Sequence, residues 1–452
     1  MSQFKQNFAK ARGSVTFVVG LTLAFGTVYS LEQWQPRGAQ SMVSGSPIEF
    51  VESESLPLRA ARPLSLAELE MARVAWSYFQ NNTDQQTGLV NSVDGYTAAT
   101  LWDTASYLLA LLSAHDLALI DYSEFESRLT RVLNTLADIP LFDDKLPNKV
   151  YSTASGSMTT YENHPTSRGV GWSAIDIGRI MVPFNALVWK YPEFTESIDS
   201  VLSNWDLQSI IRDAEMVGAD IDDQDATLYL QEGRLGYEEY AAKSLVLAGL
   251  DLSEAVNYER YFEYVDIDGV SVGTDLRTPD KLDAINFVVS EPYVLDGIEF
   301  GWDRFSKSLA YGVYRAQEER YNRTGTLTAV SEDNIDQAPY FVYNSVFADG
   351  KAWNTVTEKG EDATPFRTLS TKASLGWYAL YDTPYTEKLF NRVQDNYAVG
   401  KGFYAGIYEE DGEINKALTA NTNAIVLESL RYIEHGPVIS IGKRIEASVR
   451  ID

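Results

Sequence analysis

The sequence contains no cysteine and only three histidines in 452 residues. The lack of thiols excludes disulfides, thiolate metal sites and cysteine nucleophiles. With His115, His164 and His435 as the only imidazoles, a histidine-rich metal site or a serine–histidine–aspartate triad is hard to assemble. Any enzymatic chemistry therefore falls to the carboxylates, of which the chain has 64.

Positive charge is also scarce, because 37 Lys and Arg residues face those 64 acids and leave a net charge of −27. Such a surface repels phosphate backbones, so nucleic acid is excluded as a partner. A strongly anionic polysaccharide is disfavoured for the same reason. Aromatic residues are plentiful, with 27 Tyr and 9 Trp, and aromatic faces either build a core or stack on sugars. A neutral glycan is the partner that fits this composition.

One apolar run of 18 residues, 14–31, follows Lys5, Lys10 and Arg12. That length is just sufficient to span a bilayer, and the preceding positive residues place their end in the cytoplasm. The run is interpreted as an uncleaved membrane anchor, with a signal peptide cleaved near Val28-Tyr29-Ser30 as the alternative. In both cases the rest of the chain lies outside the cytoplasm.

Residues 32–64 lack periodicity and are expected to form a linker. Ser65 and Glu68 then form a capping-box pattern that predicts the first helix of a domain spanning 65–437. The tail 438–452 has no assigned role.

A repeated unit runs through that domain: a polar, glycine-containing loop, an apolar helix and then an amphipathic helix. The apolar helices are headed by Trp102, Trp172, Tyr237, Trp302, Trp377 and Asn423. Six such hairpins predict an all-α domain, an (α/α)6 toroid with the loops gathered at one mouth. An open solenoid is the alternative, although the short last interval favours closure. Residues 261–275 and 285–297 alternate like strands and are expected to form a small sheet or long loops at the mouth.

Several motifs resemble the bacterial domain of unknown function 3131. These are GVGWSAIDIGR, GYEEYAA, EFGWDRF, DQAPYFVYNS and, most specifically, GFYAGIYEEDGEINKALTANTNAIVLESLRY. The similarity covers about residues 65–437. That family is similar to (α/α)6 glycoside hydrolases that act on β-1,2-glucans, including the cyclising domain of cyclic β-1,2-glucan synthases. The resemblance implies the toroid and a glycan ligand. It supplies no catalytic residues. For a bacterial protein, the N-terminal apolar run predicts a location on the periplasmic side of the inner membrane.

Glycoside cleavage generally uses two carboxyl groups, one on each side of the scissile bond. Glu238 and Glu239 are candidate proton donors, because they begin an apolar helix and adjacent like charges raise a pKa. Asp336, in a polar loop, and Glu409, among aromatic residues, are candidates for the opposing carboxylate. The structural alternatives are acids at a helix N-terminus and acids in turns.

Candidate sugar contacts are aromatic, acidic, amide and arginine side chains near the starts of the apolar helices. For the tryptophans the alternative is the core, and for Asp103 and Asp176 it is a capping box with the threonine or serine three residues earlier. The candidates are Trp102, Asp103, Trp172, Asp176, Arg179, Tyr237, Trp302, Arg367, Trp377, Tyr404, Asn421 and Asn423.

Neither a metal nor a cofactor is predicted. The acid clusters 222–225 and 266–268 lack the full twelve-residue calcium-loop pattern and are better explained as solvated turns. The first functional hypothesis is therefore a glycoside hydrolase or transglycosylase acting on a neutral β-glucan with two carboxylates. The alternative is a non-catalytic glycan-binding factor in polysaccharide assembly or export. A purely structural scaffold would not need so many polar and aromatic residues at the hairpin mouths.

Overall fold

The computed structural model describes residues 56–277 and 285–439. The predicted membrane segment 14–31, most of the linker and residues 440–452 of the tail lie outside the described residues. None of the described helices combines the length and apolar character needed to cross a bilayer. The predicted helix start is confirmed, since Ser65 and Glu68 form a reciprocal capping box at the first turn of α3.

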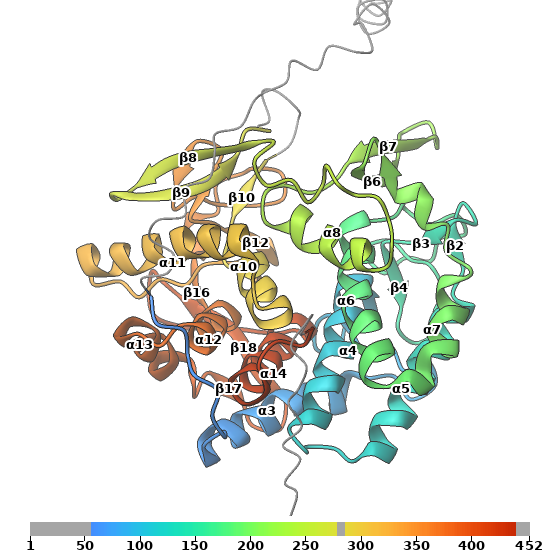
Figure 1. Ribbon diagram of the computed structural model, residues 1–452, viewed down its shortest axis with the longest axis horizontal. Coiled ribbons are helices and arrows are strands. Elements are labelled where there is room, and N and C mark those ends of the chain that lie inside the picture. The colour runs from blue at the N-terminus through green and yellow to red at the C-terminus, as the bar shows by residue number, and fades with distance from the viewer. Residues whose placement is uncertain (1–55, 278–284, 440–452) are drawn as a thin grey trace, which may run out of the picture. The chain divides into compact units, whose positions relative to one another are not determined.

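Six inner helices form a closed ring (Figure 1). Each packs against the next in chain order, and the last packs against the first, so the ring is a toroid and the open solenoid is excluded. The inner helices are α4 (Leu101–Asp116), α6 (Ala174–Lys190), α8 (Tyr237–Leu247), α10 (Glu291–Leu295), α12 (Thr371–Leu380) and α14 (Ala420–His435). Their N-termini gather at one end of the ring, which is called the mouth below.

Outer helices cover the ring at most positions. They are α3 (Leu66–Asn82), α5 (Tyr122–Asp138), α7 (Thr195–Leu202), α11 (Arg304–Thr324) and α13 (Pro384–Val393). On α5 the buried side chains recur every three or four residues, which is the period of a helix with one covered face. Inner α4 is buried on nearly all sides. This difference explains why the sequence alternates amphipathic and fully apolar helices.

The third and fourth hairpins depart from the predicted pattern. Between α8 and α10 the described residues contain no outer helix. Instead, a hairpin of β8 (Phe262–Ile267) and β9 (Val270–Asp275) packs against α11. The strand prediction for 261–275 is thus correct, whereas most of 285–297 was assigned wrongly. Only Phe287–Val288 (β10) is a strand there, and α10 continues into a π-helical turn, Asp296–Phe300 (η3), as the fourth inner element.

The position of Trp302 follows from this shift. We expected it to head an inner helix, but the helix after it is the outer α11, whose N-cap is Asp303. The Trp302 indole N–H donates to the Tyr293 carbonyl, and its ring packs near Tyr381, the C-cap of α12. Trp302 therefore lies toward the end of the ring opposite the mouth.

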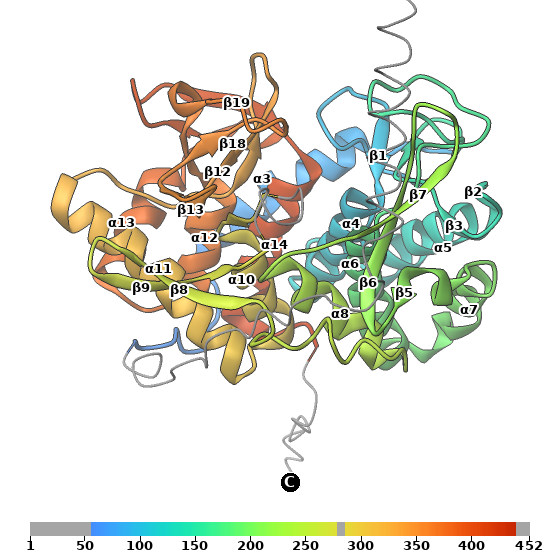
Figure 2. The same cartoon turned by 90° about the horizontal axis from the view of Figure 1, so that it is seen from above.

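Short antiparallel strands form the walls of the mouth (Figure 2). Two of them lead directly into inner helices, because β1 ends where α4 begins and β16 ends where α12 begins. The pairs and sheets are β1 (Ala98–Thr100) with β4 (Val150–Ser152); β2 (Leu141–Phe142) with β3 (Leu146–Pro147); β5 (Ile211–Arg212), β6 (Glu215–Ile221) and β7 (Thr227–Gln231); β10, β13 (Phe347–Ala348) and β14 (Lys351–Ala352); β11 (Glu332–Asn334), β12 (Phe341–Asn344) and β15 (Thr355–Val356); and β16 (Thr368–Ser370), β17 (Tyr397–Ala398), β18 (Gly402–Tyr408) and β19 (Ile414–Leu418).

The opposite end of the ring is crossed by residues 56–64. The Arg59 N–H donates to the Leu380 carbonyl at the end of α12, and the Arg62 N–H donates to the Ile433 carbonyl near the end of α14. The last described residues, Val438 and Ile439, bond there to the backbone of η3. Both ends of the described chain therefore lie at the end of the ring opposite the mouth.

Candidate active site at the mouth of the toroid

Glu291 forms the centre of a polar floor at the mouth. It is the first residue of α10, and its side chain is fully buried. The Trp102 indole N–H from α4 and the Asn421 amide from α14 both donate to Glu291 Oε1, at 3.2 and 2.9 Å. The Lys372 ammonium from α12 pairs with Glu291 Oε2. Four of the six inner helices thus converge on one carboxylate.

Lys372 also connects the floor to one wall. Its Nζ lies 3.7 Å from Asp333 Oδ1 on β11, and the Asp333 carboxyl accepts from the hydroxyls of Ser370 and Thr368, both at 3.2 Å. Lys372 is almost completely buried. Although burial opposes its charge, Glu291, Asp333 and the neighbouring Glu332 raise its pKa above the usual value. A buried cation at the N-terminus of a helix opposes the helix dipole, so these carboxylates must stabilise it.

A second acidic group lies on the other side of Trp102. The Trp102 backbone N–H lies 3.4 Å from Asp176 Oδ2 on α6. The Ser173 hydroxyl is 3.2 Å from Asp176 Oδ1 and 2.6 Å from Glu232 Oε1, and Glu232 Oε2 accepts from the Ala174 N–H at 2.6 Å. Asp176, Glu232 and Trp102 keep part of their surface open to solvent. Asp176 and Glu232 are thus the least buried acids around Trp102.

The electrostatics of the mouth favour protonated acids. Burial, with the charges of Glu232 and Asp103, raises the pKa of Asp176 to about 7. Burial raises the pKa of Asp103 to about 6, against the bonds it accepts from Thr100. Burial also raises the pKa of Asp333 to about 7, despite the opposing effect of Lys372. Acids of this kind can hold a proton near neutrality and release it to a leaving group.

Arg179 lies below the floor, in the interior of the ring. Its side chain is fully buried and bonds to Tyr240 and Glu299, while its other terminal nitrogen is 3.5 Å from Glu428 Oε1. Its guanidinium carbon is 5.2 Å from the centre of the Trp102 ring. Arg179 was predicted to bind sugar; the structure places its buried guanidinium beneath the Trp102 ring, where it can support that ring.

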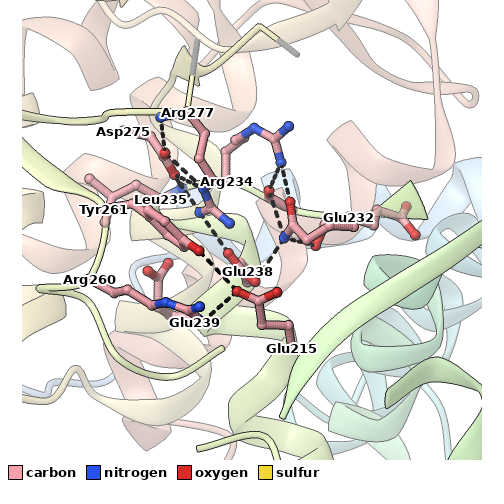
Figure 3. A network of polar contacts seen from close by, with 12 residues as sticks. Glu215, Glu232, Arg234, Leu235, Glu238, Glu239, Arg260, Tyr261, Asp275 and Arg277 are labelled. Carbon is pink, nitrogen blue, oxygen red and sulfur yellow. Dashed lines mark hydrogen bonds and ion pairs between the residues drawn. The ribbon is translucent and has the colours of Figure 1, made fainter. Parts of the chain in front are cut away.

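Glu238 and Glu239, the predicted proton donors, point to different partners (Figure 3). Glu238 pairs with Arg277 at 2.7 Å, and Arg277 also binds Asp275 at the end of β9. Glu239 accepts from the Gly236 N–H at 2.7 Å and is completely surrounded by protein. Burial and the neighbouring Glu238 raise the pKa of Glu239 to about 8. Both side chains hold the start of α8 in place.

Asp336 and Glu409, the predicted opposing carboxylates, lie in two further sets of contacts. Asp336 is exposed and accepts from the Tyr408 hydroxyl at 2.6 Å. Glu409 forms two 2.6 Å bonds with Arg320 on α11 and one of 3.3 Å with Arg367. These arginines, against the effect of burial, lower the pKa of Glu409. No hydrogen bond or ion pair described by the structure joins these two acids to each other or to Glu238 and Glu239.

Of the twelve predicted sugar contacts, five lie at or beside the floor of the mouth. Tyr237 packs edge-on against Trp102 with centroids 5.5 Å apart, beside the floor. Trp172 and Trp377 are buried in the core, and Asn423 is buried and bonds to the backbone of Phe403 and Thr419. Tyr404 lies on the wall strand β18, and Arg367 lies directly before the wall strand β16. The residues at the floor are Trp102, Asp103, Asp176, Tyr237 and Asn421; those buried or placed away from the mouth are Trp172, Arg179, Trp302, Trp377 and Asn423.

The sequence interpretation missed four residues of the site: Glu232, Glu291, Asp333 and Lys372. Glu291 was hidden because the short α10 resembles a strand next to Pro292. Asp333 lies three residues before Asp336, which was chosen instead from the same stretch. Lys372 sits in the sequence STKASLGW, and a lysine before an apolar helix is a faint but usable signal, because cations are disfavoured at helix N-termini.

No group of three or more potential ligands in the described ranges could hold a metal ion.

Comparisons with known structures agree with the observed architecture. A protein from Bacteroides caccae that carries a provisional assignment as a glucoamylase aligns with a TM-score of 0.60 at 11% identity, covering 82% of this chain and 94% of that one. An endo-β-1,2-glucanase from Chitinophaga pinensis aligns with a TM-score of 0.56 at 10% identity, covering 83% and 94%. An endo-β-1,2-glucanase from Talaromyces funiculosus aligns with a TM-score of 0.52 at 12% identity, covering 83% and 84%. At such identities the likeness establishes the fold.

Among curated protein sequences, none matches this chain. The family model described as "Protein of unknown function (DUF3131)" matches residues 70–436, which is most of the chain and nearly the whole toroid. The chain is therefore a member of the DUF3131 family.

Proposed function

We propose that this protein is a glycoside hydrolase or transglycosylase that acts on a neutral β-glucan at the mouth of the toroid. The observation that carries the proposal is that two different N–H groups of Trp102 each face a carboxyl group. Its backbone N–H faces Asp176, and its indole N–H donates to Glu291. The carboxyl groups of Asp176 and Glu291 are thus separated by a single tryptophan residue. In glycosidases the two catalytic carboxyl groups lie roughly 5 to 10 Å apart, which is a separation of this kind.

In this proposal Asp176 is the proton donor. Asp176 is only partly exposed, and burial, with the charges of Glu232 and Asp103, raises its pKa to about 7, so a large fraction carries a proton at neutral pH. Glu291, paired with Lys372, is the opposing carboxylate that stabilises the developing positive charge or activates water. This assignment replaces the pairing of Glu238 or Glu239 with Asp336 or Glu409, whose contacts are separate.

The net charge of −27 supports a neutral substrate. The half-exposed Trp102 supplies an aromatic face, and Asn421, Asp176 and Glu232 supply groups that bond to hydroxyls. The two structural neighbours described as endo-β-1,2-glucanases make β-1,2-glucan the first substrate to test.

The test is incubation of the protein with neutral glucans, β-1,2-glucan included, while new reducing ends and product size are followed. New reducing ends indicate hydrolysis, and a change in product size without new ends indicates transglycosylation. Both should be lost in Asp176→Asn and in Glu291→Gln. Activity that survives in both variants would contradict the proposed site.

One observation favours a second candidate, a glycan-binding factor for polysaccharide assembly or export. Glu291 has no exposed surface, and Trp102, Asn421 and Lys372 already occupy its oxygens. Such a carboxylate can organise a binding floor without reacting. Calorimetric binding of a glucan, with unchanged chain length after long incubation, would establish this alternative.

A further inference from the structure

Lys372 is a cation in a place where helices disfavour one. It is the second residue of α12, nearly buried, and its ammonium lies between two carboxyl groups from different elements. One is Glu291, in direct contact, and the other is Asp333, at 3.7 Å. Because Lys372 lies closer to Glu291 than to Asp333, it stabilises the negative charge of Glu291 more strongly than that of Asp333.

We propose that Lys372 is a positioning residue that divides the charge at the mouth: its direct ion pair holds Glu291 as a carboxylate, and its longer contact of 3.7 Å leaves Asp333 as the acid whose charge can change. The proposal rests on the proposed function only in assigning Glu291 a catalytic role. The division of charge itself is a property of the folded chain and can be measured without a substrate.

The hydrogen bonds of the two acids support this division. Glu291 receives two N–H donors besides Lys372, and such donors favour an ionised carboxylate. Asp333 contacts two hydroxyls, from Thr368 and Ser370, and a hydroxyl can donate to a carboxylate or accept from a carboxylic acid equally well. Asp333 can therefore change its charge without losing its partners, whereas Glu291 cannot.

Neighbouring charges act in the same direction. Burial is the main cause that raises the pKa of Asp333 to about 7, and the charges of Glu332 and Glu291 add to it, against the attraction of Lys372 and the hydrogen bond from Ser370. The charged side chains that act on Asp333 are Lys372 on α12, Glu291 on α10 and Glu332 on β11. Around them, Asp103 on α4 interacts with Glu291 and Lys372, and Tyr343 on β12 interacts with Glu332.

The decisive measurement is an infrared titration of protein labelled with ¹³C at the aspartate carboxyl groups. Asp333→Asn identifies the Asp333 band, and Glu291→Gln is compared with the double variant Glu291→Gln/Lys372→Met. Because Glu291 is neutral in both, neither leaves that carboxylate unpaired, and both are expected to fold. Removing the cation should raise the midpoint of Asp333 by about one pH unit or more, since an opposite charge within a few ångströms lowers the pKa of an acid by about that amount. An unchanged midpoint would overturn the proposal.

The single variant Lys372→Met tests whether Lys372 keeps Glu291 ionised. For this test the protein carries the ¹³C label at its glutamate carboxyl groups. A new protonated glutamate band that disappears when Glu291→Gln is added is the expected result, and Lys372→Arg should restore the wild-type spectrum. If Lys372→Met does not fold, Lys372→Gln, which keeps one donor, takes its place. Absence of the new band in a folded variant would overturn the proposal.

Lys243 provides a matched control. It is largely buried on α8 and pairs with Asp296 and with Asp303, the latter at 2.5 Å, away from the floor of the mouth. Lys243→Met should therefore lower stability without moving the Asp333 midpoint. If wild-type protein cleaves no glucan while these titrations behave as expected, the proposed function fails and the role of Lys372 stands. If glucan is cleaved but the Asp333 midpoint does not move, the proposed function stands and the role of Lys372 is overturned.

Discussion

At the scale of single residues, the mouth separates acids that can exchange a proton from acids that are locked in ion pairs. Asp176 is partly buried beside other acids, and burial raises its pKa to about 7. Glu409 is held by two arginines that lower its pKa. These different surroundings are the reason why we propose the first as the proton donor and expect the second to stabilise the fold.

Asp176→Asn should lower glucan turnover by a factor on the order of 10² to 10⁴, because asparagine cannot supply the proton to the leaving oxygen. Asparagine has nearly the same shape and can still accept a bond from Ser173, so the unfolding midpoint should change little. Initial rates across a pH series give the measurement. A variant that keeps its rate and its pH dependence would remove Asp176 from the reaction.

Glu409→Gln should act on stability instead. The change leaves Arg320 and Arg367 close together without a negative partner and should lower the free energy of unfolding by on the order of 2 kcal/mol. Turnover of folded protein should stay the same. Urea unfolding provides the comparison, with the exposed neighbour Glu410→Gln as control. If Glu409→Gln and Glu410→Gln were equally stable, the ion pairs of Glu409 with Arg320 and Arg367 would contribute nothing to stability.

At the scale of elements, glycines allow the walls of the mouth to approach the helices. Gly171, just before α6, has a φ of 116°, and a Cβ at this position would overlap the carbonyl oxygen of Ala219 on β6. The GVGW motif is therefore explained by close packing of the loop on β6, which also fixes Ser173 and its contacts with Asp176 and Glu232.

Gly171→Ala should destabilise the protein by about 2 kcal/mol or more, because overlap with backbone atoms adds to the strain of a positive φ. Gly249→Ala is the matched control, since Gly249 has a φ of 92° but nothing within 4 Å of an added Cβ. Thermal unfolding of both variants separates the two effects. If both lose the same stability, strain alone explains the result and the close approach contributes nothing.

The sequence was sufficient to predict the ring of helices, because fully apolar helices alternate with amphipathic ones at regular intervals. It failed at the fourth hairpin, where the five-residue α10 is too short to show a helical period and Trp302 follows the inner element instead of heading it. The site was predicted only where helix starts are visible, as for Trp102 and Asp176. Glu291 and Lys372 meet only because the ring closes, and no local pattern reports a contact between residues so far apart.

At the scale of the whole molecule, buried acids couple stability to pH. Burial raises the pKa of Glu239 to about 8, whereas a free glutamate titrates near about 4.3. Between these values the folded state binds more protons than the unfolded state. The contribution of Glu239 to stability is therefore complete below about pH 4 and is lost as the pH rises through about 8.

Glu239→Gln should remove this loss, because glutamine keeps an acceptor for the Gly236 N–H and cannot ionise. At about pH 8 the free energy of unfolding of the variant should exceed that of wild type by on the order of 2 kcal/mol. At about pH 4 the two free energies should be equal. Denaturant unfolding at both pH values is the measurement, with exposed Glu70→Gln on α3 as the control. A constant difference at both pH values would show that Glu239 does not titrate in this range.

The segment 56–64 fastens the chain to the ends of α12 and α14 farthest from the mouth. A fragment that begins at residue 56 would therefore carry any added tag at the end of the ring opposite the mouth. If a biosensor chip captures such a fragment by that tag, the mouth remains free to meet a polymer in the flowing buffer. Glucan affinities recorded on such a chip should then equal those recorded in free solution.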